Sequence, residues 1–174
     1  MQAAIKNTSG ETQKRQFCTF RISGRRFGVD ILDVKEINSE VDYTPIFHAP
    51  GEVRGYVNIR GQLYLLLDLG LILGFESEKV DEGSRVVLFK AEVGEPFGIL
   101  VDKIGDTIIV EEDQIENRRK DRKETEGLPE DSERRSLELG EGVCRLEDGL
   151  VVIVNSRNLL NIISDMKAHL EGGR

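Results

Sequence analysis

The residue types that carry catalysis are sparse in this sequence of 174 residues. It holds two histidines, His48 and His169, and two cysteines, Cys18 and Cys144. None of them has the spacing of a metal-ligand set, and neither a Gly-rich phosphate loop nor a nucleophile elbow is present. Asp and Glu number 32, but no pattern selects two of them for acid–base chemistry. The sequence therefore predicts no catalytic residue, no cofactor and no metal site.

One pair of opposite charges has a position that suggests a more specific role. Glu36 interrupts the apolar pattern VKEI, and Arg60 ends the pattern NIRG. In an internal repeat described below, their counterparts are Asp106 and Glu147, which are both acidic. A requirement of the repeated fold should recur in both copies, and this pair does not. Two interpretations stay open: a binding role of the first half, or an ordinary surface ion pair worth about 0–1 kcal/mol.

Short strands must position these residues. Period-two alternation and short apolar runs, separated by turn dipeptides such as Ser23-Gly24 and Asp148-Gly149, predict ten strands. Helices are few: one turn over residues 68–73 and a C-terminal helix capped by Ser156. Residues 1–14 are expected to form a flexible polar tail, and residues 165–174 a C-terminal tail. Small barrels or a sandwich are the architectures that fit this pattern.

A weak internal repeat organises the chain. A shift of 70 residues aligns the run from Arg26 to Val29 with the run from Pro96 to Ile99, and a shift of 87 aligns later strands of the two halves. The larger second shift indicates an insertion, which we assign to the charged segment 116–136 and expect to be mobile. The repeat predicts one domain over residues 15–164, with a first barrel at about 15–78 and a second at about 84–164, and it leaves open whether terminal strands swap between the barrels.

Charge and hydropathy exclude several classes of function. The net charge of −8 argues against general binding to nucleic acid or to anionic lipid. No apolar run approaches the ~18 residues of a membrane span, and the N-terminus lacks the pattern of a signal peptide. Two cysteines fit reduced thiols better than a disulfide framework. We therefore expect a cytoplasmic protein.

At these motifs the sequence resembles the CheW family of coupling proteins in bacterial chemotaxis signalling. The resemblance combines GVDIL followed by VKEI, the stretch VRGYVNIRG, a following DL, and FGILVDKIGDTIIV in the second half. It implies a mainly β fold of two five-stranded SH3-like barrels, with a few short helices. It also implies a non-enzymatic adaptor that joins the regulatory domain of the histidine kinase CheA to the cytoplasmic tips of chemoreceptors.

The resemblance also implies a binding site. A receptor helix would lie in an apolar groove between the barrels, and a salt bridge between Glu36 and Arg60 would shape that groove. The residues carried over by motif are Val34, Glu36, Gly55, Asn58, Arg60, Gly61, Val87, Gly98 and Ile104. Among them Val34, Val87 and Ile104 would supply apolar contact, and Gly98 would allow close backbone approach.

Alternative functions remain beside this one. The charged insertion replaces a proline-bearing stretch that the family uses near the kinase, so the chain could instead serve a parallel pathway as a CheW-like scaffold module with a non-standard kinase contact. A barrel that binds a small molecule, or an enzyme, would need a polar-lined pocket that the sequence does not indicate.

Overall fold

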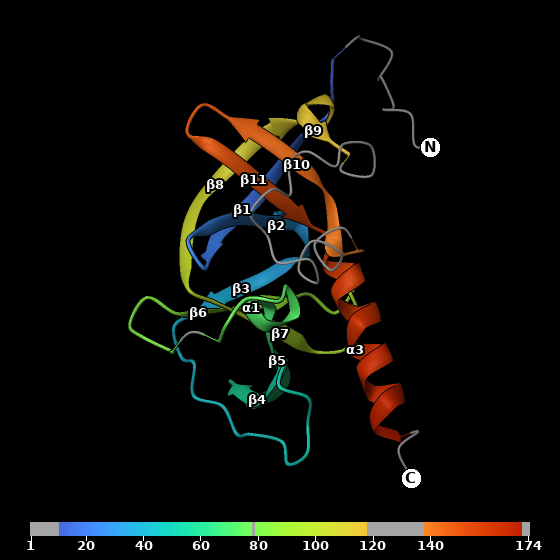
Figure 1. Ribbon diagram of the computed structural model, residues 1–174. Helices are drawn as coiled ribbons and strands as arrows, with labels where there is room; N and C mark the ends of the chain where they lie inside the picture. The colour runs from blue at the N-terminus through green and yellow to red at the C-terminus, as the bar shows by residue number, and fades with distance from the viewer. Residues whose placement is uncertain (1–10, 78, 118–137, 172–174) are drawn as a thin grey trace.

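The protein is mainly β, as the sequence predicts. A computed structural model describes residues 11–77, 79–117 and 138–171 (Figure 1). Its strands are β1 (Lys14–Ile22), β2 (Arg25–Asp30), β3 (Val34–Asn38), β4 (Val53–Ile59), β5 (Gln62–Asp68), β6 (Arg85–Phe89), β7 (Phe97–Val101), β8 (Lys103–Glu111), β9 (Ile115–Glu116), β10 (Gly140–Leu146) and β11 (Gly149–Val154). The helical segments are η1 (Ile31–Asp33), α1 (Leu69–Ile72), η2 (Glu112–Gln114) and α3 (Ser156–Glu171).

The strands form two sheets, and each sheet closes on itself. One has the order β8-β1-β2-β11-β10-β9, and the other has the order β3-β6-β7-β5-β4. In the first, the edge strands β8 and β9 are joined by the single turn η2, so the sheet curls into a barrel, called barrel A below. In the second, a bridge between Thr44 and Tyr56 pairs the chain after β3 with β4 and closes barrel B. Closure leaves few unpaired strand edges.

The pairing of strands corrects the predicted division of the chain. Barrel B is contiguous, from β3 to β7, whereas barrel A combines β1 and β2 with β8 to β11. The boundaries 15–78 and 84–164 therefore do not separate the barrels. The two halves exchange their first two strands, and this exchange leaves the hydrophobic pattern of every strand unchanged, so the pattern alone could not indicate it.

The internal repeat is confirmed by the register of equivalent strands. In barrel A, β2 runs parallel to β11, with Phe27 opposite Val152. In barrel B, β7 runs parallel to β5, with Phe97 opposite Leu65. Phe97 follows Phe27 by 70 residues, and Val152 follows Leu65 by 87. The two shifts found in the sequence therefore relate one barrel to the other.

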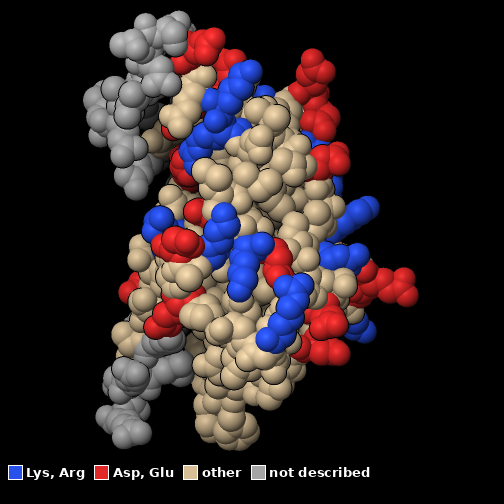
Figure 2. All heavy atoms as spheres, turned by 180° about the vertical axis from the view of Figure 1, so that it is seen from behind, with Lys and Arg blue, Asp and Glu red and all other residues tan. Residues whose placement is uncertain are grey.

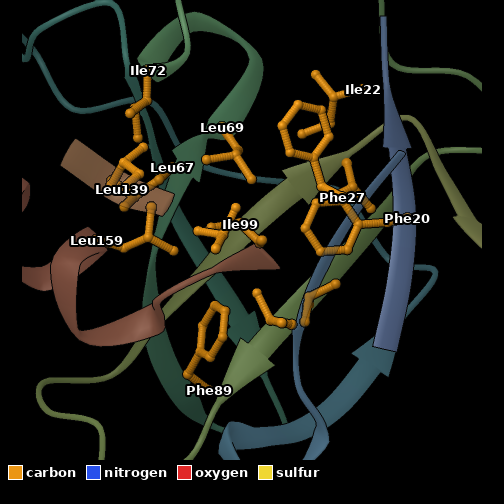
Figure 3. Packing of buried hydrophobic residues seen from close by; sticks show 14 of the residues in the cluster. Phe20, Ile22, Phe27, Leu67, Leu69, Ile72, Phe89, Ile99, Leu139 and Leu159 are labelled. Atoms are coloured by element: carbon orange, nitrogen blue, oxygen red, sulfur yellow. The ribbon is translucent and has the colours of Figure 1, made fainter. Parts of the chain in front are cut away.

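A central hydrophobic core joins the two barrels (Figure 3). It contains Phe20 and Phe27 from barrel A, Phe89 and Ile99 from barrel B, and Leu159 from α3, all at most 2% exposed. Each barrel also has a smaller interior cluster of its own. Because the largest cluster belongs to both barrels, neither barrel can lose its structure without exposing the other's apolar face.

The C-terminal helix differs from its prediction in two details. Helix α3 continues to Glu171, so most of the expected tail from 165 onward is helical. The side-chain amide oxygen of Asn155 accepts the N–H of Arg157, and the hydroxyl of Ser156 donates to Asp33 instead of capping the helix. The expected tail 1–14 contributes Lys14 to β1, and most of the insertion 116–136 lies outside the described residues.

Candidate interaction site

The ion pair between Glu36 and Arg60 is formed. Arg60 Nη1 lies 2.7 Å from Glu36 Oε2, and it joins the tip of the β4–β5 hairpin to β3. Arg60 and Gly61 both have positive φ, 52° and 82°, as a two-residue hairpin turn requires. Asn58 Oδ1 accepts the N–H of Gly61 at 2.9 Å, which fixes the turn. The Arg60 side chain is 78% exposed and that of Glu36 is 21% exposed, so the pair lies at the surface.

A second bridge lies beside this pair, and sequence reasoning missed it. Lys35 Nζ donates to the hydroxyl of Tyr64 at 2.6 Å and lies 5.3 Å from the centre of its ring. The contact joins β3 to β5, so two side-chain bridges span this end of barrel B. The repeat held a signal for this contact. The counterpart of Lys35 is Gly105, which has no side chain, so the bridge can form in only one of the two copies.

Two of the candidate glycines are required by packing. A Cβ on Gly55, whose φ is +145°, would lie 2.1 Å from the carbonyl oxygen of Thr44, at the bridge that closes barrel B. A Cβ on Gly98 would lie 2.8 Å from Leu88 Cδ2. Both glycines therefore allow neighbouring chain segments of this protein to approach each other.

The apolar candidates belong mainly to the central core. Val34 and Ile104 are half-buried and pack against it, whereas Val87 has no exposed surface. The expectation that Val87 offers apolar contact to a partner is therefore wrong for this conformation, because its side chain is enclosed by the protein. The chain crosses from barrel A to barrel B at η1 and returns at Asp102. Val34 lies directly after the first crossing, and Ile104 lies two residues after the second.

The structure thus divides the nine candidates into separate groups. The partly buried Glu36 and the exposed Asn58, Arg60 and Gly61 form one polar cluster at the surface, which we call the β3–hairpin cluster. Val34 and Ile104 offer partial apolar surface, and Gly55, Val87 and Gly98 support the fold beneath it.

At the equivalent end of barrel A, the structure has an open hollow. Its volume is about 430 Å³, and its lining includes Gly105, Asp106 and Leu146, which are the repeat counterparts of Lys35, Glu36 and Ile59. Asp106 and Glu147 cannot form the ion pair that Glu36 and Arg60 form. The charge asymmetry found in the sequence therefore corresponds to a bridged end in barrel B and an open one in barrel A.

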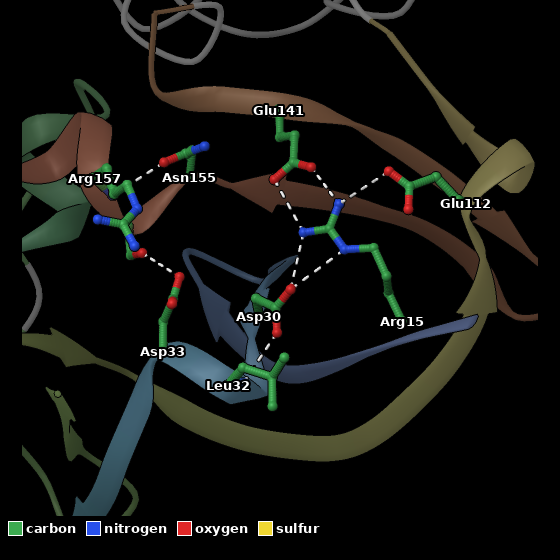
Figure 4. Close-up of polar contacts among 9 residues, drawn as sticks. Arg15, Asp30, Leu32, Asp33, Glu112, Glu141, Asn155 and Arg157 are labelled. Atoms are coloured by element: carbon green, nitrogen blue, oxygen red, sulfur yellow. Dashed lines mark hydrogen bonds and ion pairs between the residues drawn. The ribbon is translucent and has the colours of Figure 1, made fainter. Parts of the chain in front are cut away.

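A charge network lies elsewhere in barrel A (Figure 4). Arg15 on β1 contacts Asp30 at 2.9 Å, Glu112 at 3.8 Å, and Glu141. Burial lowers the pKa of the Arg15 guanidinium, but hydrogen bonds to Glu141 and Asp30 outweigh it and raise the pKa overall. Since Arg15 ties β1 to β2, η2 and β10, we assign this network to barrel stability.

The described residues give no indication of reactive chemistry. Burial raises the pKa of both Cys18 and Cys144, so neither is an activated thiolate. Within the described ranges, no group of three or more His, Cys, Asp or Glu side chains could hold a metal ion. The helices in those ranges include none that is long and apolar enough to cross a membrane.

Comparison with known proteins decides the family. The CheW-like domain matches residues 16–164. The chain belongs to the CheW-like family. It is 30% identical over 115 residues to the chemotaxis protein CheW of Klebsiella aerogenes, which covers 65% of this chain and 68% of the relative. It is 29% identical over 141 residues to the chemotaxis protein CheW of Rhizobium meliloti, which covers 80% and 83% of the two chains.

A solved structure has the same fold. The scaffolding protein TtCheW from Thermoanaerobacter tengcongensis matches with a TM-score of 0.68, at 22% sequence identity, over 82% of this chain and 89% of that one. At this identity the likeness concerns the fold alone. The predicted CheW resemblance and the predicted fold class, mainly β with two SH3-like subdomains and few helices, are both confirmed. The predicted five strands hold for barrel B, whereas the short strand β9 gives the sheet of barrel A six.

Proposed function

We propose that this chain is a non-enzymatic adaptor that couples chemoreceptors to the histidine kinase CheA. Family membership supports the signalling context. The observation that carries the proposal is the Glu36–Arg60 ion pair, since it bridges β3 and the hairpin where the family motifs VKEI and NIRG meet. The receptor would contribute a helix from its cytoplasmic tip, which would lie against the half-buried Val34 and Ile104 between the barrels.

The kinase would contribute its regulatory domain, which the family resemblance expects to have the same fold. Contact between barrels needs exposed apolar side chains, and the β4–β5 hairpin offers Tyr56 and Leu63, which are 44% and 53% exposed. Figure 2 shows a broad area without charged side chains at the lower end of the molecule, while acidic and basic residues interleave over the middle of that face.

The ion pair can be tested by exchanging its charges. We expect Glu36→Arg and Arg60→Glu each to reduce cosedimentation with receptor-containing membranes and to reduce activation of kinase autophosphorylation. The double variant restores the pair in reverse and should recover both signals in part. Because an exposed ion pair contributes only about 0–1 kcal/mol, the thermal midpoint should change little.

Two results would contradict the proposal. Wild-type protein that neither cosediments with cognate receptors nor raises kinase activity is not an adaptor of this kind. If the single variants lose thermal stability in the same proportion as receptor binding and kinase activation, the ion pair serves the fold and not the receptor contact. Receptor binding without kinase activation would favour the scaffold of a parallel pathway with a non-standard kinase contact.

A further inference from the structure

A row of three cations crosses three neighbouring strands of barrel A. Arg21 on β1 lies directly opposite Lys103 on β8 and directly opposite Arg26 on β2. Like charges in opposite positions destabilise a sheet, and here one cation has such a neighbour on both sides. The row is conspicuous in a chain whose net charge is −8. The repulsion between these opposed cations works against folding, and contact with an anionic partner would relieve it.

Among the described residues, Arg26 is the one member of the row that forms an ion pair with a carboxylate, and the charge of Arg21 also lowers the pKa of that carboxylate, Asp148. Arg26 makes two hydrogen bonds to Asp148, at 3.0 and 2.6 Å, and these lower the pKa of the Asp148 carboxyl. Arg21 donates to the carbonyl oxygen of Gly24. Within residues 11–77, 79–117 and 138–171, neither Arg21 nor Lys103 forms an ion pair. Both side chains are exposed and can meet an external anion.

The row borders the open end of barrel A. Arg21, Arg26 and Lys103 line the hollow of about 430 Å³, together with Ile104. The half-buried Ile108 and Leu146 also line it and add apolar surface. Asp106 and Asp148 complete the lining, and Arg26 already engages Asp148. A partner at this place therefore meets an apolar surface with two available cations at its edge.

We propose that Arg21 and Lys103 select receptors whose tip helix carries carboxylates next to the apolar side chain that packs on Ile104. The inference rests on the proposed function, and it specifies in addition that the receptor helix is acidic where it meets barrel A. Adjacent strands are about 4.8 Å apart, and a helix repeats about every 5.4 Å. A helix that crosses β8 and β1 can thus present acidic residues at positions i and i+4 to Lys103 and Arg21.

Other anionic partners fit this surface less well. A long polyanion such as nucleic acid would meet the net charge of −8, and two available cations release few counterions. A free phosphate would use the cations but would leave Ile104, Ile108 and Leu146 uncovered. An amphipathic helix with an acidic edge satisfies the charge and the apolar surface together.

The test is the affinity for a soluble helical-hairpin fragment of a cognate receptor tip, measured by fluorescence anisotropy at low and high salt. We expect the double variant Arg21→Glu/Lys103→Glu to bind about tenfold more weakly at low salt, and its affinity to depend less on salt. The matched control is Lys79→Glu/Arg157→Glu, which changes the net charge equally at exposed positions outside the hollow. It should retain wild-type affinity.

Charge reversal on the receptor completes the test. Replacing the acidic residues of the hairpin by Lys should restore binding to Arg21→Glu/Lys103→Glu and weaken binding to the wild type. Equal losses in both double variants, or a row variant that binds the receptor normally and loses the kinase domain instead, would overturn the inference. Failure of the wild type to bind any cognate hairpin would instead overturn the proposed adaptor function.

Discussion

At the scale of single residues, the glycines show how a family motif can serve the fold. The resemblance implied that Gly98 allows close approach of a partner. In the structure its missing side chain makes room for Leu88 and Val86, which belong to the interior of barrel B. Gly55 makes similar room for Thr44. A motif residue near a binding surface can therefore be required for the shape of that surface without touching the ligand.

Gly98→Ala tests this assignment. The new Cβ would lie 2.8 Å from Leu88 Cδ2 and 3.0 Å from the carbonyl oxygen of Val87, so the neighbouring strand must shift. We expect a loss of about 1–3 kcal/mol in the free energy of unfolding, measured by urea denaturation. Gly51→Ala is the matched control, because no heavy atom lies within 4 Å of the added Cβ. Loss of receptor binding without loss of stability would assign Gly98 to the interface instead.

At the scale of elements, the connections between strands decide how the barrels join. Asp102 is the only residue between β7 and β8, where the chain passes from barrel B to barrel A. Its carboxylate accepts the N–H of Ser23 at 2.7 Å and so holds the β1–β2 turn to the crossing. Burial raises the pKa of Asp102, and the nearby Asp68 and Asp81 raise it further, although the Ser23 hydrogen bond opposes them.

The raised pKa of Asp102 predicts a dependence of stability on pH. Because its folded-state pKa lies above the unfolded value, its ionisation disfavours folding, and stability falls as the pH rises through the pKa of the folded protein. Asp102→Asn keeps an oxygen that can accept from Ser23 and removes the charge. We expect this variant to unfold at a higher temperature than the wild type near pH 7, and the difference to vanish towards pH 3.5. A constant difference across this range would show that the charge is not responsible.

The sequence predicted the positions of strands and turns far better than it predicted which strands pair with one another. The turn at Arg60-Gly61 and the helical turn after Asp68 were predictable, because hairpin turns and helix caps depend on local residue types. The exchange of strands between halves was not, since β2 and β7 carry the same pattern and can pair with β5 or β11 equally well by alternation. The cationic row was invisible for the same reason, because Arg21, Arg26 and Lys103 become neighbours only through pairing.

At the scale of the whole molecule, the discontinuous barrel and the shared core predict one cooperative unit. Phe27 of barrel A and Ile99 of barrel B lie in the same buried cluster, and Leu159 of α3 joins it. If barrel B unfolded alone, the chain that connects β2 to β8 would lose its structure. The apolar face that barrel A buries against barrel B would then be exposed to water. The adaptor proposal depends on this coupling, because a groove between the barrels needs them held in fixed positions.

The distribution of tyrosines allows a direct test of this cooperativity. The chain has no Trp and three Tyr, at positions 43, 56 and 64, all within or between strands of barrel B. Tyrosine fluorescence therefore reports barrel B, whereas far-UV circular dichroism reports both barrels. We expect the two signals to give the same urea midpoint. Val151→Ala, in the interior of barrel A, should lower both midpoints together, because the cavity costs free energy that the whole cooperative unit shares. A tyrosine signal that stays at the wild-type midpoint while circular dichroism shifts would show that the barrels unfold independently, and the groove between them would then lack a fixed geometry.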